Sequence, residues 1–126
     1  MKHTLLALAH ALPFSACGGL EAPESSGTLQ IEAHTEPDPP HVGQNALVLH
    51  VRDADGNPVE GAAITVDTLM PSMGHGSTET PVITETGGGA YRAEPLTFQM
   101  TGSWQAIVQV VKGEEDGSRT FSWDVR

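Results

Sequence analysis

Apolar residues recur at every second position through most of the chain after Thr28, and a period of two is the pattern of half-buried β-strands. Residues that favour turns separate these rows, as in the segments Asp53–Pro58 and Gly87–Gly89. We predict that the following side chains point inward: Leu29 and Ile31; Leu47, Leu49 and Val51; Ala62, Ile64 and Val66; Tyr91 and Ala93; Leu96 and Phe98; Trp104, Ala106, Val108 and Val110; Phe121, Trp123 and Val125.

The charged segment Glu114–Gly117 lies between the last two rows and predicts a solvated hairpin turn. No amphipathic helix of useful length is indicated in this part of the chain. About seven short strands with regular turn signals are typical of a sandwich of two sheets. We therefore predict an all-β fold, an immunoglobulin-like antiparallel β-sandwich, over residues 28–126.

The start of the chain has a different pattern. Lys2 is followed by a mostly apolar run from Thr4 to Phe14, which is too short to span a bilayer but suits a secretory signal. The segment Phe14-Ser15-Ala16-Cys17 resembles the lipobox of bacterial lipoproteins, in which the cysteine becomes the lipid-modified N-terminus. We expect a signal peptide over residues 1–17 that ends at Cys17, or alternatively a conventional signal followed by a spare cysteine.

A flexible spacer is expected over residues 18–27, which are rich in Gly, Ser, Pro and Glu. Together with the lipobox, this spacer implies an extracytoplasmic domain on the periplasmic side of the cell envelope, anchored to the membrane through lipid on Cys17.

Composition narrows the possible functions. Sixteen acidic against six basic residues give a formal net charge of −10, which argues against nucleic acid or an anionic membrane surface as a partner. The single cysteine excludes an intrachain disulfide and a thiolate zinc cluster. No G-x-S-x-G or H-E-x-x-H motif is present, so we expect neither an enzyme nor catalytic residues. The acidic turn at Asp53 does not match a calcium loop, because Gly56 stands too early and Ile64 occupies the place of the final glutamate.

Soft metal ligands are concentrated in the segment from Met70 to Gly76. Thioether sulfur prefers Cu(I) to hard cations, and imidazole binds copper and zinc. Met70, Met73 and His75 therefore predict a Cu(I) site, since zinc favours His, Cys and carboxylate over thioether. The alternative is that Met70 is the last inward residue of the strand that contains Ile64 and Val66.

Two further residues are candidates for this copper site. Met100 stands just before the Gly102 turn, and we expect that turn to lie on the same rim of the sandwich as Met70. Met100 would then be a fourth ligand, with Trp104 covering the site; alternatively it packs in the core in line with Leu96 and Phe98. His34 and His50 are expected on the surface, whereas His41 lies in a loop and is a weaker candidate ligand.

Three spaced motifs carry a resemblance to a known family. They are Met70-Pro71-x-Met73-x-His75, Gly89-x-Tyr91 and Phe98-x-Met100-x-Gly102-x-Trp104, and they resemble the YtkA-like and FixH-like group of extracytoplasmic β-sandwich domains. That group is associated with copper handling and with assembly of cytochrome oxidases. The resemblance implies Met70, Met73 and His75 as copper ligands and a copper chaperone with an acceptor cuproprotein or oxidase assembly factor as its partner. The second His-x-Met pair of the better-defined periplasmic oxidase chaperones is absent.

A second resemblance favours a spacer or interaction module over a metal-binding domain. The segment Val51–Ala62 is similar to a strand-turn-strand signature of bacterial sandwich modules, including carboxypeptidase-regulatory-like domains, which are often spacers. Two functions therefore stay open from the sequence. One is a lipid-anchored copper-binding domain that holds or transfers Cu(I), in copper homeostasis or oxidase assembly. The other is a non-metal interaction module or accessory subunit of an envelope complex.

Overall fold

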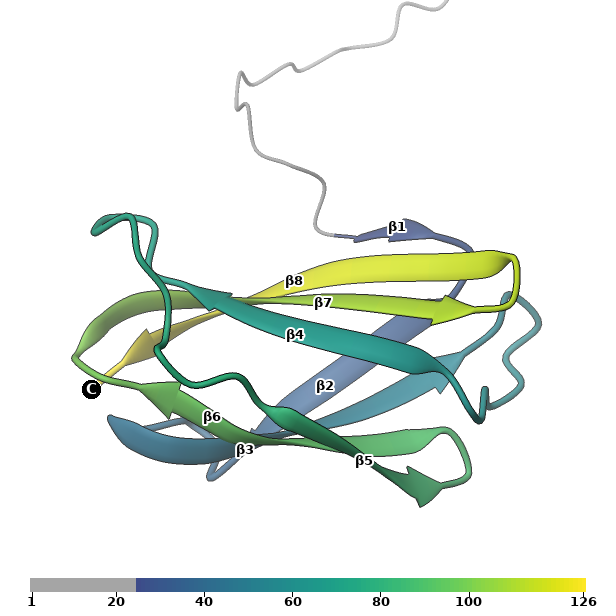
Figure 1. The fold of residues 1–126 in the computed structure, drawn as a ribbon, viewed down its shortest axis with the longest axis horizontal. Helices are drawn as coiled ribbons and strands as arrows, with labels where there is room; N and C mark the ends of the chain where they lie inside the picture. Colours follow the sequence, from purple (N-terminus) through teal and green to yellow (C-terminus); the bar gives the residue numbers. More distant parts are fainter. Residues whose placement is uncertain (1–24) are drawn as a thin grey trace, which may run out of the picture.

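Two antiparallel sheets of four strands each form the fold in the computed structural model, which describes residues 25–126 (Figure 1). The strands are β1 (Ser25–Gly27), β2 (Gln30–Glu36), β3 (Gly43–Arg52), β4 (Ala63–Leu69), β5 (Val82–Gly87), β6 (Ala90–Phe98), β7 (Gly102–Lys112) and β8 (Glu115–Val125). One sheet has the order β1-β8-β7-β4 and the other β2-β3-β6-β5.

This order is that of a constant-type immunoglobulin sandwich, with β1 added at one edge. The predicted all-β, immunoglobulin-like sandwich is therefore confirmed. No helix long and apolar enough to cross a membrane occurs in residues 25–126.

The core lies between the sheets and is built from the predicted inward rows. Trp104, Tyr91 and Phe98 are its largest fully buried side chains. The aliphatic rows of β3 and β7 are buried around them, whereas Ala62, Ile64, Phe121 and Trp123 pack at its margin. Burial of apolar area, at about 25 cal/mol per Å², is the main stabilising contribution to such a core.

The structure differs from the sequence interpretation at two places, the strand that pairs with the edge of β8 and the turn that precedes β8. Strand β1 falls within the predicted spacer 18–27, because Ser25, Ser26 and Gly27 pair with β8. The hairpin turn consists of Gly113 and Glu114, not residues 114–117, because Lys112 already pairs with Glu115. Gly113 has φ +62°, which suits a tight hairpin turn. Cys17 and the signal segment lie outside the described residues.

The hydroxyl of Tyr91 fastens the connection between β3 and β4 to the core. It donates a hydrogen bond to the carbonyl of Val59 (2.7 Å) and accepts one from the backbone N–H of Ala62 (3.1 Å). Burial raises the pKa of Tyr91 above its ordinary value of 10.0. The chain that enters β4, and through β4 the loop at Met70, is therefore positioned by a neutral buried phenol.

Tyr91→Phe tests this role. The substitution keeps the ring but leaves a buried carbonyl and an N–H without their partner, so we expect a loss of about 1–3 kcal/mol in the free energy of unfolding. Urea unfolding followed by fluorescence measures the change, with an unaltered denaturant slope as the sign of an intact fold. An unchanged midpoint would show that the hydroxyl does not secure this connection.

Candidate metal centre

The loop after β4 is closed by backbone hydrogen bonds. Met70 and His75 form an isolated antiparallel bridge, in which the N–H of Met70 donates to the carbonyl of His75 (2.7 Å). The N–H groups of Met73 and Gly74 both donate to the carbonyl of Met70 (3.0 and 2.9 Å), and Gly74 has φ +70°. Because residues opposite each other in such a bridge project to the same side, the turn brings the Met70 and His75 side chains together at its base.

Pairing between β4 and β7 carries this loop to the β6–β7 turn. Leu69 pairs with Gln105, so the next residue, Met70, arrives beside Trp104 and Gly102. A Cβ added at Gly102 would collide with the terminal methyl Cε of Met70. Gly102 also has φ +138°, a conformation that favours glycine. The thioether of Met70 thus lies directly against the turn that follows Met100.

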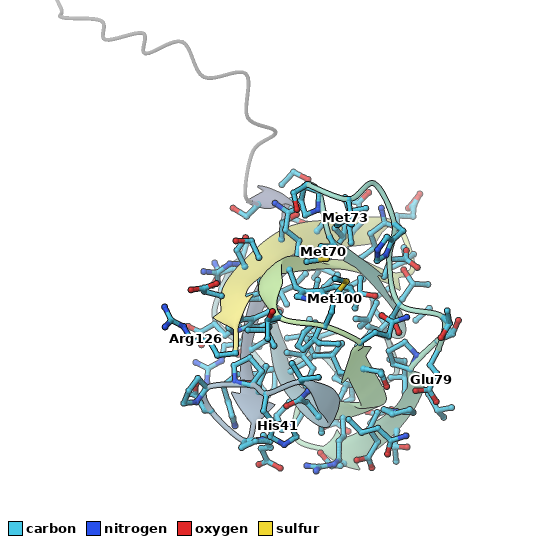
Figure 2. All side chains as sticks on the ribbon, turned by 90° about the vertical axis from the view of Figure 1, so that its left-hand side faces the viewer. His41, Met70, Met73, Glu79, Met100 and Arg126 are labelled. Atoms are coloured by element: carbon cyan, nitrogen blue, oxygen red, sulfur yellow. The ribbon has the colours of Figure 1, made fainter. Side chains whose placement is uncertain are left out.

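Trp104 joins the two segments. Its indole Nε1–H donates to the carbonyl of Met100 (2.9 Å), and its ring meets the imidazole of His75 edge to face, with 6.1 Å between centroids. Figure 1 places the loop after β4 and the β6–β7 turn at the same end of the sandwich, and Figure 2 shows Met70, Met73 and Met100 gathered there. The structure therefore places Met70 and the turn at Gly102 on the same rim of the sandwich, as predicted.

These donors differ in exposure. Met70 is 4% exposed and belongs to the core, so it points inward as the alternative interpretation expected, although β4 itself ends one residue earlier, at Leu69. Met73 and Met100 are 55% and 40% exposed, and His75 is exposed. Packing of Met100 in the core is therefore wrong: β6 ends at Phe98, and the turn before Gly102 directs the next side chains to solvent.

The imidazole of His75 is free to bind through one nitrogen. Its Nδ1 lies 3.3 Å from the carbonyl oxygen of Gly76, to which it donates a hydrogen bond in the neutral tautomer that is protonated at Nδ1. In that tautomer Nε2 keeps its lone pair. Three thioethers and one imidazole nitrogen thus occur at this end of the sandwich, and this donor set fits Cu(I) better than a hard cation.

His41 is not brought to this set. Figure 2 shows it across the end of the sandwich from the methionines. Its Nδ1 lies 2.8 Å from the carbonyl of Val42, and the backbone N–H of His41 donates a hydrogen bond to Oδ1 of Asn45 (3.0 Å). Within residues 25–126, no group of three or more His, Cys, Asp or Glu side chains is arranged to hold a metal ion.

Two structural contacts of this centre, one made by Gly102 and one by Trp104, differ in how far the sequence indicates them. The contact between Gly102 and Met70 depends on the register of β4 against β7, which the sequence does not specify. The hydrogen bond from Trp104 to Met100 could have been anticipated, because a buried indole N–H usually finds an acceptor.

Comparison with known proteins identifies the family. No curated protein and no solved structure matches the chain. A family model described as YtkA-like matches residues 24–109, which include β1 to β6, the Met70–Gly76 loop and most of β7. The chain therefore belongs to the YtkA-like family.

Proposed function

We propose that this chain is a copper-binding domain of the cell envelope that holds Cu(I) at the end of the sandwich and passes it on. The role is not catalytic. Cu(I) would be taken up and released by ligand exchange, because exposed thioethers can be replaced one at a time by the ligands of an acceptor protein.

The observation that carries this proposal is the joining of two distant segments that both bear soft donors. Met70 contacts Gly102, and Trp104 contacts both His75 and the backbone of Met100. An exposed methionine leaves apolar surface in water, which gives up the stabilisation that burial would provide. Two of the five large hydrophobic residues exposed in the described part of the chain are Met73 and Met100. A ligand role accounts for both being at this one end.

Burial assigns different roles to the donors. Met73, His75 and Met100 are accessible and would make the first contacts with the ion. Met70 is buried, with its terminal methyl against Gly102, and it would supply a further sulfur from the buried side of the site. A three-coordinate site made of the exposed donors leaves a position open for an acceptor.

The N-terminal pattern and the net charge support the proposed location, and the family resemblance supports the proposed partners. A lipid on Cys17 would hold the domain at the extracytoplasmic side of a membrane, where thioethers have the advantage that they form no disulfides. The partner would be an acceptor cuproprotein or an oxidase assembly factor, in copper homeostasis or oxidase assembly. The net charge of −10 suits a soluble face turned away from the membrane.

A second function is favoured by the burial of Met70. If this residue acts only in the core, the domain is a non-metal interaction module of an envelope complex, and the exposed Met73 and Met100 are contacts for a protein partner. Titration with Cu(I) separates the two functions.

Replacing sulfur without changing shape tests ligation directly. Met73→Leu and Met100→Leu conserve volume, and surface substitutions usually change stability by less than about 0.5 kcal/mol. We expect each variant to bind Cu(I) about tenfold more weakly or worse, equivalent to about 1.4 kcal/mol, in competition with a Cu(I) chelator under reducing conditions. Wild-type affinity in both variants would remove these sulfurs from the site.

The imidazole is tested against a matched histidine. His75→Gln should weaken Cu(I) binding, whereas His41→Gln, which changes another exposed loop histidine of the same end, should leave it unaltered. Tryptophan fluorescence provides a second measurement, because the His75 ring lies 6.1 Å from that of Trp104 and copper bound there should quench indole emission. Equal losses in the two variants would contradict a specific role for His75.

A further inference from the structure

The outer face of the β2-β3-β6-β5 sheet carries histidine and glutamate side chains that lie away from the Met70–Gly76 loop. Glu32, His34 and Glu36 alternate with the buried or partly buried residues of β2, so they share this face. His50 projects from the same face of β3, between the buried Leu49 and Val51. The Met70–Gly76 loop, in contrast, follows β4 of the other sheet.

His34 and His50 are stacked across the two strands. Their ring centroids lie 6.4 Å apart with an interplanar angle of 23°. The register pairs His34 with Val48 and Glu32 with His50, so the two histidines are diagonal neighbours and Glu32 is directly opposite His50. The side chain of His34 is 49% exposed, and exposed side chains change rotamer on the picosecond to nanosecond timescale.

We propose that His34 and His50 form a second metal site, which takes a divalent ion of the kind that imidazole prefers, Cu(II) above all. Rotation of the two rings toward each other brings one nitrogen of each to the same ion. Water completes the coordination, so the two imidazoles are the protein ligands of this site.

The choice of Cu(II) over zinc follows from the number and kind of donors. Zinc sites in proteins commonly have three or four protein ligands, whereas this pair supplies two imidazoles. Cu(II) binds nitrogen and oxygen donors in tetragonal geometry and stands above zinc in the Irving–Williams order. Glu36 lies 4.0 Å from Nε2 of His34, but its carboxylate is already held by Arg92 at 2.8 Å, so no carboxylate is assigned to this site.

This site does not depend on the thioether centre. It contains no sulfur, and it lies on the outer face of the β2-β3-β6-β5 sheet instead of at the end of the sandwich. It is expected to bind the oxidised ion, whereas the methionines are expected to bind the reduced one. One domain would thus carry separate sites for the two oxidation states of copper.

Titration of the full chain with Cu(II) under oxidising conditions tests the proposal. We expect the electron paramagnetic resonance signal of the bound ion to show two coordinating imidazole nitrogens, with one lost in His34→Gln and one in His50→Gln. Each variant should bind Cu(II) at least about tenfold more weakly, since loss of even an outer-shell partner of a metal ligand has such an effect.

Controls fix the position of the ion. His41→Gln and Met73→Leu should keep the affinity and the two-nitrogen signal. Paramagnetic broadening in NMR spectra should affect the amides of residues 32–36 and 48–52. The proposal is overturned if both histidine variants keep wild-type affinity, if only one of them loses it, or if broadening is confined to residues 70–76. Failure here would leave Cu(I) binding by the methionines untouched.

Discussion

A buried indole sets the geometry of the candidate copper centre. Trp104 is fully buried, and its Nε1–H must find an acceptor because an unpaired buried donor costs about 1–3 kcal/mol. The acceptor is the carbonyl of Met100. The hydrogen bond that the buried indole needs therefore also holds the turn in which the side chain of Met100 is exposed. The edge of the same side chain meets His75 on the other segment. Trp104 thus fills part of the core and also contacts both segments that carry the soft ligands.

Most of the fold could be predicted from the sequence because the alternation of apolar and polar residues within each strand shows which of its side chains point inward. The rows at Leu47, Leu49 and Val51 and at Trp104, Ala106, Val108 and Val110 are buried as the period of two indicates. The limits of the elements were less predictable. The acidic run 114–117 suggests a turn by composition, but the tight turn at Gly113 and Glu114 extends the hairpin into that run.

The candidate sites show where sequence reasoning stops. Spacing alone brings Met70, Met73 and His75 into one loop, and strand ends suggest that Met100 shares their rim. Whether each methionine is buried or exposed depends on where β6 ends and how β4 pairs with β7, so the burial of Met70 and the exposure of Met100 required the structure. The stacking of His34 on His50 likewise depends on the register of β2 against β3, and each histidine taken singly is an ordinary surface residue.

The central claim is that sulfur from this end of the sandwich binds copper. X-ray absorption spectroscopy at the copper edge, on the full chain loaded with one equivalent of Cu(I), measures the identity of the ligand atoms directly. The account predicts reduced copper with at least two sulfur neighbours and one imidazole nitrogen. Because the only cysteine is Cys17, the same spectrum from Cys17→Ser should be unchanged. A first shell of nitrogen and oxygen alone would contradict the account.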